Sequence, residues 1–175
     1  RLAERLPPFI ALFVGCIGLA DGIEVTLHPD RMGLLGTAFG IQLIACGLVL
    51  AALRVPLLAR RAEALATLLV ATCAVTINLY NGGIGSWAER LAMAQICLLG
   101  SLPALLPWSW RAQAVVSAVS LATFTWVLPW MRSSDDAFWA ALGLAIGSIT
   151  STVGARFLER YRRGWAEQTA RLAEE

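Results

Sequence analysis

Six apolar runs, each about as long as a membrane-spanning helix, constrain this chain more than any other feature. They cover about residues 8–27, 33–53, 62–80, 91–110, 112–131 and 137–158. A helix needs roughly 20 apolar residues to cross the hydrocarbon core of a bilayer, and no run has the alternating pattern of a membrane strand. The sequence therefore predicts an all-α polytopic membrane protein, in which three consecutive helical hairpins form one transmembrane domain, residues 1–158.

The composition supports this class. The chain has 175 residues, of which 58% are hydrophobic and 15% are charged, and its mean hydropathy is +0.67. A soluble domain usually has about 45–50% apolar and about 25% charged residues. All 14 basic residues are arginine, which together with the abundance of Ala and Leu indicates a GC-rich bacterial gene. Because the first residue is Arg1 and not methionine, we expect the sequence to be a piece of a longer protein.

Arginine is distributed unequally between the two predicted sides of the membrane. With the N-terminus inside, only Arg31, Arg90 and Arg132 fall on the outer side. The inner segments carry the other eleven, Arg1, Arg5, Arg54, Arg60, Arg61, Arg111, Arg156, Arg160, Arg162, Arg163 and Arg171. Since cytoplasmic loops carry an excess of basic residues, the sequence predicts a multi-pass protein of the bacterial inner membrane with both termini in the cytoplasm.

The last predicted span continues without a helix-breaking residue into a polar segment, residues 159–175. Steps of three and four residues separate Leu158, Tyr161, Trp165, Gln168, Leu172 and Glu175. This is the a/d spacing of a short coiled coil, with Arg and Glu filling positions between. We therefore expect a cytosolic signalling helix that dimerises and leads into an output domain of the same polypeptide. Gln168 at a d position is either a register marker of the dimer or a solvent-exposed residue of an ordinary helix.

Small residues line one face of the sixth predicted span. Gly143, Gly147 and Gly154 are separated by steps of four and seven. Such stripes allow close approach of helices, either within one bundle or between protomers. The coiled coil that follows favours a homodimer contact for this helix.

Acidic residues gather at the outer end of the first predicted span. Asp21, Glu24 and His28 are separated by steps of three and four and therefore share one helical face. An ionisable group at the depth of Asp21 costs about 2.5–3.5 kcal/mol on insertion scales unless it faces a partner or water. We expect a ligand site or a divalent-cation site with Asp21 and Glu24 as metal ligands.

The alternative is that these residues are solvated at the interface and pair with arginines of the outer side. That interpretation fits Glu89, Asp135 and Asp136 better than the deeper Asp21 and Glu24.

Polar residues inside the other spans extend the same hypothesis. Asn78, Tyr80 and Asn81 end the third span, Gln95 lies in the fourth, and Gln42 lies near the middle of the second. They could line an outer-leaflet pocket that includes Asn78 and Gln95. Hydrogen bonding between helices explains them equally well.

The sequence contains no constellation typical of an enzyme. Without lysine there is no retinal Schiff base, and a single histidine argues against bis-histidine haem ligation. No P-loop, nucleophile elbow or zinc-hydrolase motif occurs. Four cysteines, one in each of the first four spans, lack metal or redox spacing, as expected for apolar fillers: Cys16, Cys46, Cys73 and Cys97. We expect no catalytic residues, no cofactor apart from the divalent cation, and no nucleic-acid partner.

Six spans that end in FLERYRRGWAEQTARLAEE resemble the membrane input module of bacterial membrane-anchored signalling enzymes. The resemblance is closest to membrane class III adenylyl cyclases, and diguanylate cyclases and six-span sensor histidine kinases share the plan. It implies a homodimeric, receptor-like domain that senses a ligand or ion on its outer side and transmits the change through a helix pair. Some membrane cyclases of this type are thought to bind a cation among outer-leaflet carboxylates, which fits Asp21 and Glu24.

The sequence thus predicts a sensory and regulatory module of a dimeric signalling enzyme. The alternative is a small transporter or channel, with Asp21, Glu24, Gln42, Asn78 and Gln95 lining a polar path.

Overall fold

A computed structural model describes residues 2–133 and 137–174, with side chains up to Arg171 in the last helix. Arg1, Asp135, Asp136 and Glu175, and the side chain of Leu172, to which some of the predictions refer, lie outside the described residues. The helices are α1 (Leu2–Leu27), η1 (Pro29–Arg31), α2 (Met32–Leu53), α3 (Pro56–Ala59), α4 (Ala62–Gly83), α5 (Ala88–Leu105), α6 (Trp110–Val127), η2 (Leu128–Trp130) and α7 (Ala137–Glu174). The prediction of an all-α fold is confirmed.

Five of the six predicted spans are long and apolar enough to cross a membrane. These five helical segments are Leu2–Leu27, Pro29–Leu53, Ala62–Gly83, Trp110–Trp130 and Ala137–Arg171. The predicted fourth span, α5, is not among them. It has 18 residues, and Glu89, Arg90 and Gln95 lower its hydropathy.

The predicted boundary between the fourth and fifth spans is displaced. We expected the fourth span to reach residue 110, but α5 ends at Leu105, two residues after Pro103. Residues 106–109, which include Pro107, form the connection instead. Ser109 then begins α6 as its N-cap, since its Oγ accepts a hydrogen bond of 3.3 Å from the amide of Ala112.

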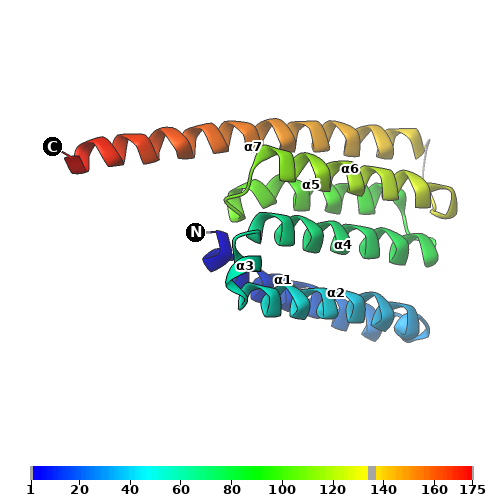
Figure 1. Cartoon of the computed structure of the whole chain (residues 1–175). Coiled ribbons are helices and arrows are strands. Elements are labelled where there is room, and N and C mark those ends of the chain that lie inside the picture. The colour runs from blue at the N-terminus through cyan, green and yellow to red at the C-terminus, as the bar shows by residue number, and fades with distance from the viewer. Residues whose placement is uncertain (1, 134–136, 175) are drawn as a thin grey trace.

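The helices are stacked in layers, with α1 and α2 at one edge, α4 next, then α5 and α6, and α7 at the opposite edge (Figure 1). The predicted first and third hairpins are packed pairs, α1 with α2 and α6 with α7. The second predicted hairpin is not. Its helix α4 packs mainly on α2 and α6, whereas α5 packs mainly on α7. Helices adjacent in sequence therefore do not all become neighbours in space.

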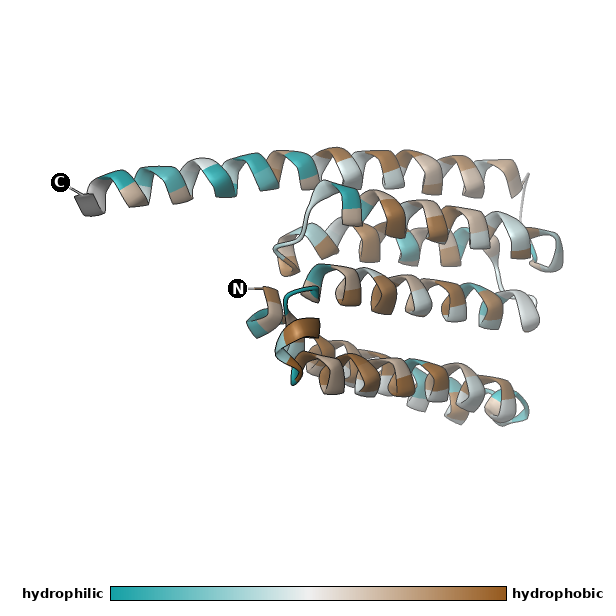
Figure 2. Ribbon diagram, viewed as in Figure 1, coloured by the Kyte–Doolittle hydropathy of each residue, from teal (hydrophilic) through white to brown (hydrophobic). Residues whose placement is uncertain are grey.

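The bundle has two ends that differ in what they carry. We call the end with the α1–α2 and α4–α5 connections and η2 the distal end, and the end with the start of α1 and the α5–α6 connection the proximal end. The polar half of α7 projects beyond the proximal end, whereas the bundle itself is dominated by apolar residues (Figure 2). A core of leucines and aromatics joins α5, α6 and α7, with Leu99, Leu102, Phe124 and Leu144 fully buried.

Candidate functional site

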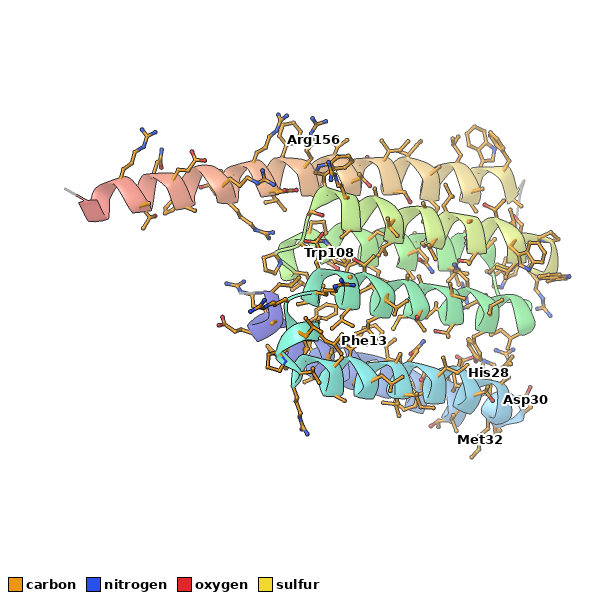
Figure 3. All side chains as sticks on the ribbon, viewed as in Figure 1. Phe13, His28, Asp30, Met32, Trp108 and Arg156 are labelled. Atoms are coloured by element: carbon orange, nitrogen blue, oxygen red, sulfur yellow. The ribbon has the colours of Figure 1, made fainter. Side chains whose placement is uncertain are left out.

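A pocket of about 570 Å³ opens among α1, α2, α4 and the start of α5 in the distal half of the bundle. This volume is typical of small-molecule sites, which span about 300–1,000 Å³. Its polar lining comprises Asp21, Glu24, His28, Arg31, Gln42, Tyr80, Asn81, Ser86, Arg90 and Arg132. The structure thus brings the predicted trio Asp21, Glu24 and His28 together in one pocket. Figure 3 places His28 at the distal end, close to the α1–α2 turn.

Glu24 is engaged by two neighbours at the side of this pocket. Its Oε1 accepts a hydrogen bond of 3.1 Å from Nη1 of Arg31 and one of 3.0 Å from the hydroxyl of Tyr80. Arg31 also approaches the carboxylate of Asp30, with 4.0 Å between Nε and Oδ2. These contacts hold α1 to α4 and neutralise Glu24. The predicted alternative, in which an outer-side arginine pairs with the acidic cluster, therefore holds for this residue.

Asp21 and Gln42 lie in the same pocket with hydrogen-bonding capacity to spare. The carboxylate of Asp21 is half-buried and makes no hydrogen bond or ion pair with any residue in the described ranges. Gln42 is only 4% exposed, and its Nε2 donates a hydrogen bond of 2.8 Å to Oγ1 of Thr76. Its Oε1, by contrast, is buried and has no hydrogen-bond partner in the part of the chain that the structure describes. Native proteins rarely leave a buried acceptor unpaired, so this atom is a candidate ligand contact.

Local turn structure positions the distal rim of the pocket. Gly85 follows α4 with a φ of 61°, and its amide donates to the carbonyl of Gly82 while the amide of Ser86 donates to that of Asn81. This is the Schellman arrangement, which needs a left-handed residue and therefore favours glycine. Next, the amide of Arg132 donates to the carbonyl of Ser86 over 2.9 Å. The α4–α5 connection and the end of η2 are thereby joined at the rim.

The described residues do not form a ready metal centre. No group of three or more His, Cys, Asp or Glu side chains within residues 2–133 and 137–174 is placed to hold a metal ion. Ca²⁺ takes six or more oxygen ligands, and Mg²⁺ usually keeps several of its waters when it binds a protein. With Glu24 already bonded to Arg31 and Tyr80, a metal at Asp21 and Glu24 would depend mainly on water.

Asn78 and Gln95, the other two predicted ligand residues, lie outside the pocket lining. Both are fully buried between α4, α5 and α6. Nε2 of Gln95 donates to Oδ1 of Asn78 over 2.8 Å, and the hydroxyl of Ser120 donates to Oε1 of Gln95. Nδ2 of Asn78 donates to the hydroxyl of Thr123 and to the carbonyl of Ser120. Their amide groups are paired, so they join helices, as the alternative interpretation expected.

A second buried network, which the sequence did not reveal, links α5, α6 and α7. Nε2 of Gln113 donates to the carbonyl of Leu99 over 3.0 Å and to the hydroxyl of Ser151 over 2.7 Å. Ser117 of α6 and Ser148 of α7 are also buried, and their hydroxyls have no hydrogen-bond partner among the described residues. Gln113 lies only three residues after the first residue of α6. Polar side chains are typical of such helix ends at a membrane interface, so its position in the sequence did not indicate that it is buried.

At the proximal end, α7 holds the α5–α6 connection through charged side chains. Nη2 of Arg162 donates to the carbonyl of Pro103 over 2.6 Å, in the last turn of α5. Oε2 of Glu159 accepts a hydrogen bond of 3.0 Å from the amide of Trp110, the first residue of α6. Each charge complements the dipole of the helix end that it contacts. We call Glu159 and Arg162, with these two helix ends, the proximal clamp.

Arg156 adds to the proximal clamp from the half of α7 that packs against the bundle. Its guanidinium carbon lies 5.7 Å from the centre of the Trp110 ring, and that of Arg111 lies 5.8 Å from the same ring. Figure 3 shows Arg156 and Trp108 at this end of the bundle.

The predicted dimer stripe on α7 divides into two parts. A Cβ added at Gly147 would lie 2.7 Å from Cγ1 of Ile96 on α5, so this glycine permits close packing within one chain. A Cβ added at Gly143 or Gly154 would have no described atom within 4 Å apart from the neighbouring backbone of α7 itself. Beyond the bundle, Leu158, Tyr161 and Trp165 are 37%, 64% and 58% exposed.

Comparison of the chain with protein-family models, with curated proteins and with solved structures finds no match.

Proposed function

We propose that this chain is the sensory and regulatory membrane module of a dimeric bacterial signalling enzyme, a nucleotide cyclase, diguanylate cyclase or histidine kinase. It lies in the inner membrane with six spans and both termini in the cytoplasm. A ligand or cation at the distal pocket changes the packing of the helices, and α7 passes the change to a cytosolic output domain of the same polypeptide.

The observation that carries this proposal is the continuity of α7. The helix has 38 residues and is therefore about 57 Å long, whereas the hydrocarbon core of a bilayer is about 30 Å thick. Its first half is packed against α5 and α6, and its second half leaves the bundle as a polar helix (Figure 2). One continuous helix thus joins the apolar bundle to the polar segment, residues 159–174.

Buried contacts provide a physical route from the pocket to α7. Arg90 and Leu91 of α5 line the pocket, and α5 packs along α7. The amide of Gln113 joins α5 to Ser151 of α7, and the proximal clamp ties Arg162 to the end of α5. A shift of α5 would therefore move α7, as a rotation or a change of register that biases a two-state dimer.

The polar half of α7 presents the side chains that suit a homodimer. Tyr161 and Trp165 are exposed and contact one another, with ring centres 6.1 Å apart. They lie on the face predicted as the a/d seam, together with Leu158. Pairing with a second copy in parallel would bury these rings, and burial of apolar area is the main driving force of association in water.

Cysteine cross-linking in membrane vesicles tests the dimer. In a background without Cys16, Cys46, Cys73 and Cys97, Tyr161→Cys places a thiol on the predicted seam. Ala170→Cys is the matched control, because nine residues turn an α-helix by about 180° relative to Tyr161. We expect Tyr161→Cys to form disulfide-linked dimers under mild oxidation and Ala170→Cys to remain monomeric. Equal yields at the two positions, or none at either, would contradict a dimer seam on this face.

The alternative of a transporter or channel requires a polar path through the bundle. The polar lining of the distal pocket ends at Gln42. A cavity of about 10 Å³ in the proximal half is lined only by apolar side chains, among them Phe9, Phe13 and Leu102. This difference between the two halves favours a receptor pocket that ends inside the bundle over a path that crosses it.

A further inference from the structure

Asp21 and Gln42 both line the distal pocket, and each carries an acceptor group that no described residue serves as donor. The Oε1 of Gln42 is buried and unpaired, although the other end of the same amide is fixed by Thr76. The carboxylate of Asp21 lines the same pocket and has no partner among the described residues. Gln42 is the eleventh residue of α2, so it lies about 15 Å from the distal start of that helix. The lining of the pocket therefore includes one negative charge and one amide oxygen that have no hydrogen-bond donor among the described residues.

An organic ammonium group fits this pair better than a metal ion. A protonated amine carries one charge and three N–H donors, which can serve the Asp21 carboxylate and the Gln42 carbonyl together. Such charge-assisted hydrogen bonds are stronger than neutral ones. A divalent cation takes several oxygen ligands, and no group of three His, Cys, Asp or Glu side chains among the described residues is placed to hold one.

The rim of the pocket carries the opposite charge. Arg31 is paired with Glu24, but Arg90 and Arg132 are exposed and make no ion pair with a described residue. A guanidinium presents several N–H donors in a plane and binds a carboxylate through two parallel hydrogen bonds. The rim therefore suits an acidic group.

We propose that the pocket binds a small ω-amino acid, with its ammonium group on Asp21 and Gln42 and its carboxylate on Arg90 and Arg132. Asp21 lies six residues before the distal end of α1, a rise of about 9 Å, so the two charges of the ligand must be several bonds apart. Ile17, Phe39 and Ile77 line the pocket and would contact the methylene chain. This inference names the ligand class of the input pocket, and its biological role rests on the proposed function.

Calorimetric titration of the full chain in lipid nanodiscs, with empty nanodiscs as the blank, tests the assignment. The probes are 6-aminohexanoate, glycine, pentylammonium, pentanoate and calcium chloride. We expect 6-aminohexanoate to bind at least about tenfold more tightly than any other probe, because only it satisfies both charge sites at once. Asp21→Asn and Arg132→Gln should each weaken it at least about tenfold.

Two further variants keep this test independent of folding. Asp21→Glu retains the charge and should retain measurable binding. Asp30→Asn removes an exposed carboxylate next to the pocket and should leave the affinity unchanged. Failure of all probes to bind, calcium binding that depends on Asp21, or equal affinity for 6-aminohexanoate and pentylammonium would each overturn the proposal.

The result is separable from the test of the dimer. Binding of 6-aminohexanoate without cross-linking at Tyr161→Cys would leave this ligand assignment standing and contradict the proposed dimeric module. Cross-linking without binding would overturn the ligand assignment alone.

Discussion

Gly147 offers the sharpest test of how α7 packs within the bundle. A Cβ at this position would lie 2.7 Å from Cγ1 and 3.2 Å from Cγ2 of Ile96. Real Cβ atoms do not tolerate the first distance, so either Ile96 or the helix must move. Overpacking of this kind typically costs about 1–3 kcal/mol. At Gly143, one turn earlier on the same helix, an added Cβ meets nothing within 4 Å.

The difference between Gly147→Ala and Gly143→Ala is the predicted quantity. Both substitutions gain the same helix propensity, about 0.8–1 kcal/mol in water, and this contribution cancels in the comparison. We therefore expect Gly147→Ala to unfold with a free energy lower by about 1–3 kcal/mol than that of Gly143→Ala.

The assay is reversible unfolding by SDS in mixed micelles, followed by tryptophan fluorescence. Ile96→Ala removes both of the crowding γ-carbons, so it should relieve most of the penalty of Gly147→Ala, with a coupling energy of about 1 kcal/mol or more. An equal stability of the two alanine variants would refute packing of Gly147 on α5. Loss of dimer, rather than of stability, in Gly147→Ala would place the stripe between protomers instead.

The buried network of Asn78, Gln95 and Ser120 and the proximal clamp each yield a further prediction. Gln95→Leu leaves Oδ1 of Asn78 without a donor and the hydroxyl of Ser120 without an acceptor. The free energy of unfolding should therefore fall by about 1–3 kcal/mol in the same micelle assay. An unchanged free energy of unfolding would contradict the network. Arg162→Gln removes the charge at the end of α5 and should speed proteolysis of the α5–α6 connection in detergent. Arg160→Gln is the control, because no contact of Arg160 is described, and it should leave the rate unchanged. Equal rates of proteolysis in the two variants would contradict the proximal clamp.

Much of the fold could be predicted because its determinants are local. Apolar runs located the helices, and steps of three and four placed Asp21, Glu24 and His28 on one face, since these patterns depend only on helix geometry. Pairing of helices is not local. Of the three predicted helical hairpins, the second is not a closely packed pair, because α5 packs mainly on α7 and only weakly on α4.

The candidate site was predicted only in part for the same reason, because contacts between helices distant in the sequence do not follow from local patterns. Asn78 and Gln95 are polar, as pocket residues often are. Only their contacts with each other and with Ser120 on a third helix show that their amides are already paired. Glu159 and Arg162 stand in a charged run typical of a coiled-coil flank, and their contacts with two helix ends depend on where the α5–α6 connection lies.

The central claim, that α7 transmits a signal as one rigid helix, is tested most directly by changing its phase. The chain is joined after Glu175 to a dimeric adenylyl cyclase domain, and two or seven residues of neutral helical sequence are inserted at the junction. Two residues rotate the helix by about 200°, whereas seven add two turns of a coiled coil and restore the phase. The proposal predicts that cyclase activity changes with two residues and returns with seven. Activity that does not respond to either insertion would contradict transmission through α7.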